Sequence, residues 1–155
     1  MRLLVAPLSR RHLPEVLAIE RASFARPWEP ALFEAEIRHA QALPLVALSL
    51  PAGMVVAYLC LWLMGEEVQV QNLAVHPAFR RRGVGRSLLA QGLREARRRG
   101  ARLATLEVRP SNLAARRLYA SLGFLETGRR PGYYHTEGED ALILHCRLEE
   151  TPWLP

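Results

Sequence analysis

Apolar residues recur along the chain with two spacings, one typical of strands and one typical of helices. Short runs rich in valine and leucine, bounded by glycine or proline, predict seven strands, over residues 3–7, 43–50, 54–63, 68–75, 103–108, 124–129 and 141–148. Apolar residues three and four positions apart predict four helices, over residues 9–23, from just after Trp28, and over 83–99 and 113–122. The resulting order is β-α-α-β-β-β-α-β-α-β-β, without an internal repeat.

This order predicts the α/β class, with a central mixed sheet of about seven strands covered by four helices. The 155 residues, 50% of them hydrophobic, are enough for one well-buried core and too few for two. We therefore expect a single domain over residues 1–150, followed by a short C-terminal tail over residues 151–155.

The apolar runs predict neither a membrane span nor a signal peptide. The longest uncharged run, residues 54–64, is too short to cross a bilayer, and residues 1–8 are too few for a signal-peptide core. Cys60 and Cys146 lie in apolar, strand-like runs, and two cysteines cannot form a disulfide framework. We expect reduced thiols, no membrane partner and a cytoplasmic protein.

The chain is strongly basic, and arginine alone carries its positive charge. A net charge of +6 and a pI near 10.3 indicate anionic partners. The absence of lysine excludes a Walker-type phosphate lysine and a Schiff-base nucleophile. Asp140 is the only aspartate, and the histidines have no metal-ligand spacing with the cysteines, so we expect no metal.

Residues 76–86, between a predicted strand and a predicted helix, form a candidate phosphate-binding loop. Gly83 and Gly85 open the helix, where free N–H groups and the helix dipole attract phosphate oxygens. The arginines of the loop add long-range attraction. Leu88 stands where a dinucleotide-binding loop needs its third glycine, so that class is excluded. A tight turn beside a solvated run of charge is the alternative.

At this loop the sequence resembles the GNAT acetyltransferases. Arg80 to Gly85 matches the family signature of Arg or Gln, two variable residues, Gly, one variable residue, then Gly or Ala. The preceding Asn72 to Val75 is similar to the family's strand that pairs with the pantetheine arm of CoA. The resemblance implies a GNAT fold, with acetyl-CoA as cosubstrate in a gap where this strand and the next parallel one splay apart. The implied contacts are Leu73, Ala74 and Val75 for pantetheine, and Arg81, Arg82, Gly83, Val84, Gly85 and Arg86 for the pyrophosphate.

The predicted strand 103–108 places Glu107 on the face opposite Leu106 and Val108. An amine attacks a thioester only when it is neutral, and an α-amino group with a pKa of about 8 is mostly protonated at neutral pH. A carboxylate within hydrogen-bond reach removes that proton, so Glu107 is the candidate general base. An ion pair with Arg109 at the rim of the sheet is the alternative.

Tyr119, in the predicted helix 113–122, is the candidate acid that protonates the departing CoA sulfur, with an ordinary half-buried core tyrosine as the alternative. Residues 106–112 and 118–124 resemble the bacterial ribosomal-protein-alanine N-acetyltransferases. The resemblance implies that Glu107 and Tyr119 are the base and the acid and that Asn112 contacts CoA. An asparagine just before a helix is also a standard N-cap, and the two roles are compatible.

The resemblance covers nearly the whole chain and implies a peptide-binding groove built by its outer segments. The candidate substrate contacts there are Trp28, Tyr133 and Tyr134. His135 departs from the family, in which proline commonly follows the tyrosine pair. The implied function is transfer of acetyl from acetyl-CoA to a protein N-terminus, namely the N-terminal alanine of a small-subunit ribosomal protein, by direct attack in a ternary complex.

Three alternatives remain beside this function. An acetyltransferase of broader N-terminal, lysine or small-amine specificity would keep the chemistry and change the acceptor. An arginine-rich nucleic-acid-binding module would use residues 80–82 and 97–99, but no aromatic platform is interleaved with these arginines, which makes RNA contact secondary. A CoA sensor without turnover would not need Glu107 and Tyr119, and both are present.

Overall fold

The computed structural model describes residues 1–134 and 139–151; the side chains of Tyr133 and Tyr134 lie outside that description. The described strands are β1 (Arg2–Pro7), β2 (Ala42–Leu50), β3 (Met54–Met64), β4 (Glu67–Val75), β5 (Leu103–Val108), β6 (Leu125–Tyr134) and β7 (Glu139–Arg147). The described α-helices are α1 (Leu13–Ser23), α2 (Pro30–Arg38), α3 (Val84–Arg98) and α4 (Leu113–Ser121). The predicted order of elements is confirmed.

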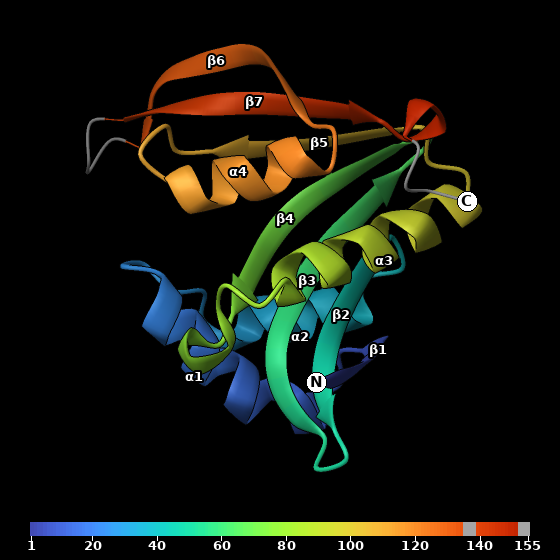
Figure 1. The fold of residues 1–155 in the computed structure, drawn as a ribbon, viewed down its shortest axis with the longest axis vertical. Helices are drawn as coiled ribbons and strands as arrows, with labels where there is room; N and C mark the ends of the chain where they lie inside the picture. The colour runs from blue at the N-terminus through green and yellow to red at the C-terminus, as the bar shows by residue number, and fades with distance from the viewer. Residues whose placement is uncertain (135–138, 152–155) are drawn as a thin grey trace.

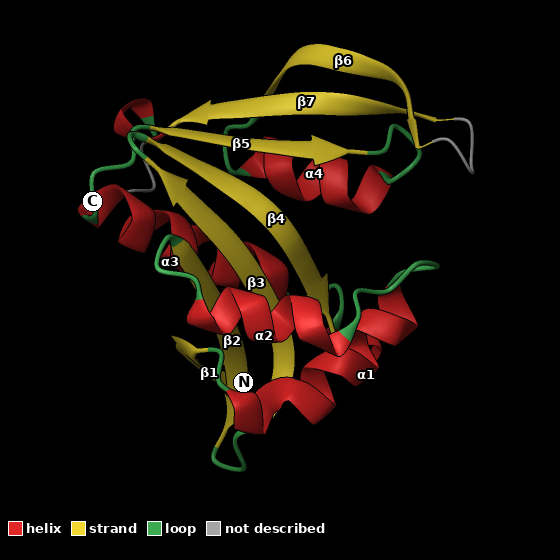
Figure 2. Ribbon diagram, turned by 180° about the vertical axis from the view of Figure 1, so that it is seen from behind, coloured by secondary structure: helices red, strands yellow, loops and turns green. Residues whose placement is uncertain are grey.

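The strands form one mixed sheet in the order β1-β2-β3-β4-β5-β7-β6 (Figure 1). Among the described strands, β4 and β5 are the one neighbouring pair that runs parallel. Helices α3 and α4 cover one face of the sheet, and α1 and α2 cover the other (Figures 1 and 2). A mixed sheet covered by four helices confirms the predicted class.

Two apolar cores lie on the two faces of the sheet, and β3 contributes to both. Leu59 and Leu61 pack under α3, whereas Tyr58 and Cys60 pack under α1 and α2. This burial on both faces explains why β3 is apolar almost throughout. Helix α3 approaches β3 so closely that a Cβ on Gly92 would lie 2.6 Å from a methyl group of Leu59.

The parallel strands β4 and β5 part soon after they begin. Their ladder joins Glu67–Gln69 to Leu103–Thr105 and extends no further among the described residues. On the other side of β4, Asn72 lies opposite Cys60 and Val70 lies opposite Leu61, which leaves Gln71 as an extra, bulged residue. A β-bulge bends its strand. Strand β4 therefore leaves β5 at the bulge, and a gap opens between the two strands.

Two element boundaries differ from the prediction by more than two residues. Residues Arg10–His12 form a 3₁₀ turn, and α1 begins only at Leu13. Pro14 suits this start because it lacks an N–H and the first turn of a helix does not need one. Strand β6 continues to Tyr134, although Pro131 and Gly132 interrupt its apolar pattern. Its edge position explains this, because an edge strand tolerates a missing ladder hydrogen bond.

His12 makes the start of α1 sensitive to acid. It is buried, and its Nδ1 accepts the backbone N–H of Ser9 at 3.0 Å, which requires that nitrogen to be unprotonated. Burial, and then the nearby Arg11, lower the His12 pKa from 6.5. Because the folded pKa is depressed, the unfolded chain takes the proton first. The free energy of unfolding should therefore fall as the pH drops from 6.5 toward the folded pKa. Urea titrations across this pH range give the free energy of unfolding at each pH. Its slope against pH should be smaller in His12→Gln than in wild type, and equal slopes would contradict this role of His12.

Three further features of the described chain concern its last residue, membrane spans and metal sites. Thr151, the last described residue, is buried, and its hydroxyl donates to the Arg147 carbonyl at 2.7 Å. No helix within residues 1–134 and 139–151 has the length and apolar character needed to cross a membrane. In the same residues, no group of three or more His, Cys, Asp or Glu side chains is arranged to hold a metal ion.

Candidate active site

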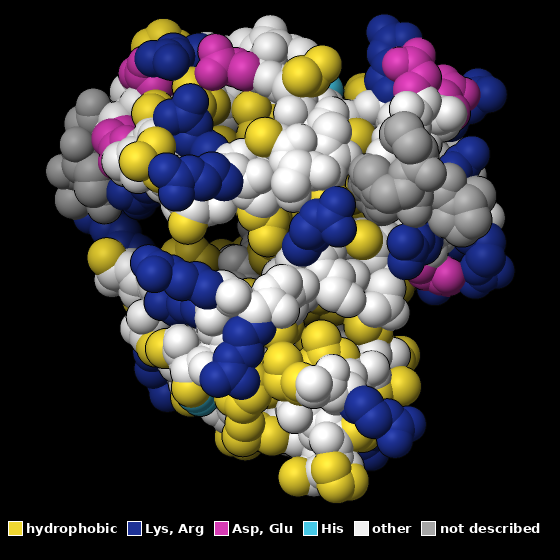
Figure 3. Space-filling model, in the orientation of Figure 1, with side chains coloured by type: hydrophobic (Ala, Val, Ile, Leu, Met, Phe, Trp, Pro, Cys, Tyr) yellow, Lys and Arg dark blue, Asp and Glu magenta, His cyan; other side chains and the backbone are white. Residues whose placement is uncertain are grey.

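The gap between β4 and β5 opens into two adjoining cavities, of about 470 Å³ and about 590 Å³. Residues of β4 line one side of both cavities and residues of α4 line the other. The last residue of α1, Ser23, also lines both. They share the residues Ser23, Phe24, Leu73, Asn112, Ala115 and Tyr119. Figure 3 shows the surface hollowed beside α4, with arginine side chains on the rim of the hollow. We call the first cavity the acceptor end of the cleft and the second the loop end.

The loop end lies against the start of α3. Gly83 has a left-handed φ of 75° at the N-cap, and Arg81 has a φ of 62°. The first N–H groups of a helix have no partner within it, so the start of α3 offers donors and a positive dipole end to an anion. Four of the candidate phosphate contacts, Arg81, Gly83, Gly85 and Arg86, line this cavity.

Two further candidate contacts of the loop, Arg82 and Val84, are placed differently from these four. The Arg82 guanidinium lies 5.4 Å from the centre of the Phe79 ring, and Arg82 does not line the loop end of the cleft. Val84 borders the cavity, but its side chain is buried in the core, so only its backbone is suited to a ligand. Val84 is the first residue of α3 and lies on the apolar face of this amphipathic helix, which explains why its side chain faces the core.

Arg80, the first residue of the loop signature, holds the loop in place. Its Nε donates to the Val75 carbonyl at 3.0 Å, and its terminal nitrogen donates to the Ser23 hydroxyl at 3.1 Å. Arg80 thus joins the end of β4 to the last residue of α1. Arg86 makes a similar link to α4, since its Nε donates to the Ser121 hydroxyl at 3.2 Å.

Gly85 is packed by protein side chains on the floor of the loop end. A Cβ at this position would lie 3.3 Å from methyl groups of both Leu118 and Val75. We expect Gly85→Leu to push α4 and β4 apart and weaken acetyl-CoA binding about 10-fold or more, with a smaller loss in Gly85→Ala. Isothermal titration of both variants, with circular dichroism to confirm folding, tests this. Wild-type affinity in Gly85→Leu would show that this packing does not shape the cleft.

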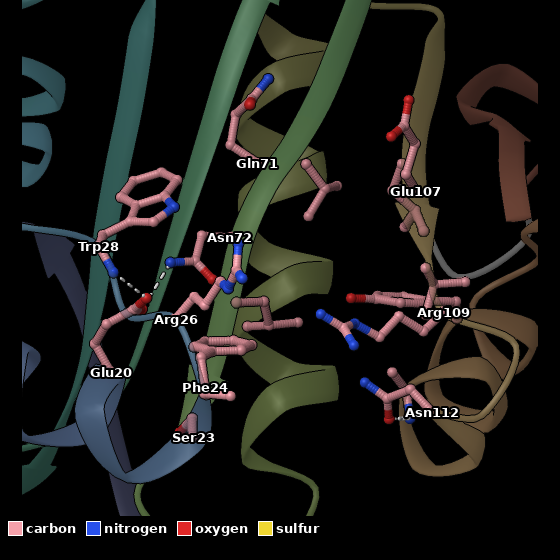
Figure 4. A pocket seen from close by; sticks show the side chains of 17 residues that line it. Glu20, Ser23, Phe24, Arg26, Trp28, Gln71, Asn72, Glu107, Arg109 and Asn112 are labelled. Carbon is pink, nitrogen blue, oxygen red and sulfur yellow. Dashed lines mark hydrogen bonds between the residues drawn. The ribbon is translucent and has the colours of Figure 1, made fainter. Parts of the chain in front are cut away.

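Glu107 projects from β5 into the acceptor end (Figure 4). Its side chain is 27% exposed, and Oε1 lies 3.0 Å from a guanidinium nitrogen of Arg130 on β6. The ion pair fixes the orientation of the carboxylate, while partial exposure leaves it reachable from the cleft. Arg109, the partner considered in the alternative interpretation of Glu107, also lines this cavity. The pairing with Arg130 could not be foreseen, because it depends on the register of β6 against β7.

Tyr119 and Asn112 lie where the two cavities meet. Tyr119 is 9% exposed, and its ring centre lies 5.8 Å from that of Phe124, so the ring is held by the core while it borders the cleft. Asn112 is the N-cap of α4, because its Oδ1 accepts the Ala115 N–H at 3.2 Å. Its amide nitrogen points toward the cleft in Figure 4. The two roles considered for Asn112 are therefore compatible in this geometry.

The segment between α1 and α2, residues 24–29, forms the outer wall of the acceptor end. Phe24, Arg26 and Trp28 all line the cavity. The Trp28 ring packs on Phe33 of α2, with centres 5.1 Å apart. The backbone of β6 reaches Tyr133 and Tyr134, but their side chains and all of His135 lie outside the described residues.

Three polar residues that line the acceptor end were not predicted as site residues. Glu20, Gln71 and Asn72 all border the cavity, and Glu20 is almost completely buried. Glu20 shares the helical spacing of Leu13 and Val16, which places it on the face of the first helix that is expected to be buried. An acidic residue at a position predicted to face the core is unusual, and this was the signal that could have identified it.

The cleft places an anion-binding helix start, a gap between parallel strands and a carboxylate in one continuous space. Such a cleft suits an enzyme that takes an acyl group from a phosphate-bearing carrier. The chain belongs to the acetyltransferase (GNAT) family, whose sequence model matches residues 13–124.

Curated relatives and solved structures agree with this assignment. The chain is 39% identical over 143 residues to the [ribosomal protein bS18]-alanine N-acetyltransferase of Salmonella typhimurium, covering 90% of this chain and 94% of that protein. It is 38% identical over 122 residues to the N-alpha-acetyltransferase RimI of Mycobacterium tuberculosis, covering 76% and 74% of the two chains. The crystal structure of the ribosomal-protein-S18-alanine N-acetyltransferase from Escherichia coli superposes with a TM-score of 0.86 at 34% identity, covering 95% and 94% of the two chains.

Proposed function

We propose that this protein transfers the acetyl group of acetyl-CoA to the N-terminal α-amine of a protein, with the N-terminal alanine of a small-subunit ribosomal protein as its acceptor. The observation that carries this proposal is the position of Glu107 in the same cleft as the start of α3. A phosphate-bearing donor held at the loop end reaches the acceptor end through the junction at Tyr119. The relatives named for bS18 alanine acetylation support the choice of acceptor.

The donor would lie along the free edge of β4. Beyond Gln69 the backbone of β4 has no described ladder partner in β5, so the backbone groups within Leu73 to Val75 that do not bond β3 can offer hydrogen bonds to an extended chain such as pantetheine. The Val75 carbonyl already accepts from Arg80, which leaves the remaining edge groups for this purpose. The loop residues Arg81 to Arg86 would bind the pyrophosphate.

The chemistry follows from two groups of the cleft, Glu107 in the acceptor end and Tyr119 at the junction of the two cavities. Glu107 removes a proton from the acceptor ammonium, and the neutral nitrogen attacks the thioester carbonyl carbon. The tetrahedral intermediate collapses with cleavage of the C–S bond. Tyr119 donates its proton to the departing sulfur, and the attacking nitrogen returns its second proton to the Tyr119 oxygen, directly or through water. The products are the acetylated amine and the free CoA thiol, and Glu107 releases its proton to solvent. No covalent acetyl-enzyme is needed, and the thiols Cys60 and Cys146 are both buried away from this path.

An α-amine suits this site better than a lysine side chain does. The pKa of an α-amine is lower than that of a lysine by roughly two to three units. A single carboxylate base therefore deprotonates an α-ammonium group at a lower cost in free energy than a lysine ammonium group. The two reduced, buried cysteines also fit a cytoplasmic protein, the compartment in which a ribosomal acceptor is made.

The basic surface supports at most a secondary RNA contact. In the last turn of α3, Glu95 binds Arg98 at 2.5 Å and Arg99 at 3.0 Å. The hydrogen bonds from these arginines lower the pKa of the Glu95 carboxyl to about 2. Part of this charge cluster is thus neutralised within the helix, which favours the enzyme over a nucleic-acid-binding module.

A peptide panel tests the acceptor directly. It contains peptides that begin with alanine or with other residues, and N-blocked peptides with an internal lysine, all incubated with acetyl-CoA and analysed by mass spectrometry. The proposal predicts preferential acetylation of the alanine N-terminus. Acetylation of lysine alone, or of every amine equally, would overturn the acceptor. Steeply salt-dependent RNA binding without acetyl-CoA affinity would instead establish the nucleic-acid module.

A further inference from the structure

The last turn of α1 places a buried carboxylate, Glu20, in the wall of the acceptor end. Glu20 is 1% exposed and borders the cavity. Its Oε2 accepts the backbone N–H of Trp28 at 2.8 Å, and its Oε1 accepts the amide of Asn72 at 2.8 Å and the hydroxyl of Tyr58. Figure 4 shows the bonds to Trp28 and Asn72. Three donors therefore satisfy one buried carboxylate.

The three donors belong to three different parts of the fold. Trp28 belongs to segment 24–29, the outer wall of the acceptor end, whereas Tyr58 lies on β3. Asn72 lies on β4, between the bulged Gln71 and Leu73, which borders both cavities. Glu20 thus joins the wall that faces the acceptor to the strand that faces the acyl donor.

The loop end is tied to the same helical turn. Ser23 follows Glu20 by three residues, and its hydroxyl accepts a hydrogen bond from Arg80 at 3.1 Å. The same hydroxyl donates to the Ile19 carbonyl at 2.6 Å. The last turn of α1 is therefore a common support for the acceptor wall, β4 and the phosphate-binding loop.

Stability alone does not account for a carboxylate at this position. Its neighbours form an apolar core that includes Val16, Ile19 and Phe33, which an apolar side chain of similar volume would fill. Buried charges are costly, and their replacement by well-packed apolar groups is often neutral or stabilising. A carboxylate with three directed hydrogen bonds instead fixes the relative positions of the groups that it joins.

We propose that Glu20 is a positioning residue for the acceptor: it holds segment 24–29 at a fixed place relative to β4, and so sets how tightly the acceptor peptide binds. This inference rests on the proposed function, since it assigns the acceptor to the cavity that segment 24–29 lines. Glu20 does not touch the reacting atoms in this assignment. It acts through Trp28 and Asn72.

Steady-state kinetics of Glu20→Gln test the proposal. Glutamine keeps the shape of the side chain but has one acceptor oxygen and adds an amide that faces a donor, so the three bonds cannot all be kept. We expect the KM for the acceptor peptide to rise about 10-fold, the scale of losing a hydrogen bond to a charged group. The turnover number and the Kd for acetyl-CoA should stay within about 2-fold of wild type.

Glu36→Gln is the matched control. Glu36 is 8% exposed, and its two oxygens share the single indole N–H of Trp62, at 2.9 and 2.7 Å, but it does not line the cleft. Its substitution should leave the acceptor KM unchanged. An equal rise in KM in Glu36→Gln, or a wild-type KM in Glu20→Gln, would overturn the proposal.

Two further measurements distinguish a loss of the positioning role from a folding defect and from a failure of the proposed function. Tyr58→Phe removes one donor and keeps the ring that packs on Phe33 at 5.5 Å, so it should give a smaller rise in acceptor KM. Amide hydrogen exchange at Trp28, followed by NMR, should be faster in Glu20→Gln than in wild type or Glu36→Gln. Unchanged exchange would overturn the positioning role even if no peptide is acetylated, whereas fast exchange without any transfer would overturn the function alone.

Discussion

Replacing Glu107 with glutamine should lower the turnover number about 10²-fold or more, the scale of losing a general base. Glutamine has the same shape but cannot take a proton from the acceptor ammonium. Glu107 does not line the loop end, so the Kd for acetyl-CoA should stay close to that of wild type. Initial rates of peptide acetylation, with isothermal titration of acetyl-CoA, measure the two quantities.

Glu126→Gln provides the matched control for this prediction. Glu126 is an exposed residue of β6 that borders neither cavity of the cleft, so its replacement should leave both quantities unchanged. A wild-type turnover number in Glu107→Gln would remove Glu107 from the mechanism. A large loss of acetyl-CoA affinity would show that Glu107 acts in donor binding.

Tyr119→Phe should slow the chemical step about 10- to 100-fold, since it removes the proton donor for the departing thiolate. The ring should remain packed against Phe124, because only the hydroxyl is lost. The rate at which CoA thiol is formed in a single turnover, measured with a thiol reagent, reports this chemical step and does not depend on the slow steps of repeated turnover. A normal single-turnover rate would mean that another group protonates the sulfur.

Tyr58→Phe makes a useful comparison with Tyr119→Phe. Both changes remove one buried hydroxyl, but Tyr58 is bonded to Glu20 and Tyr119 borders the junction of the cavities. We expect Tyr58→Phe to affect the acceptor KM and Tyr119→Phe to affect the chemical step. This difference separates a positioning hydroxyl from a catalytic one.

The order of helices and strands could be predicted because apolar spacing is a local property. The strand 103–108 shows this, since its alternation alone placed Glu107 on the half-exposed face. The extension of β6 to Tyr134 could not be predicted in the same way. Pro131 and Gly132 normally end a strand, and only the position of β6 at the sheet edge makes them acceptable.

The candidate site was predictable where it rests on short motifs. The loop at Gly83 and the N-cap at Asn112 are encoded within a few residues, and the structure shows both. The contacts of Glu20 with Asn72, and of Glu107 with Arg130, join residues far apart in the sequence. Such pairs depend on strand order and register, which no local pattern contains.

The central claim is that a neutral α-amine attacks acetyl-CoA directly in the cleft between β4 and β5. The most direct test is to incubate the protein with acetyl-CoA alone, record its intact mass, and then add a peptide that begins with alanine. The account predicts an unmodified protein before the addition and, after it, one acetyl group on the peptide α-nitrogen for each CoA thiol released. An acetylated protein before the addition, or no transfer to the peptide, would contradict it.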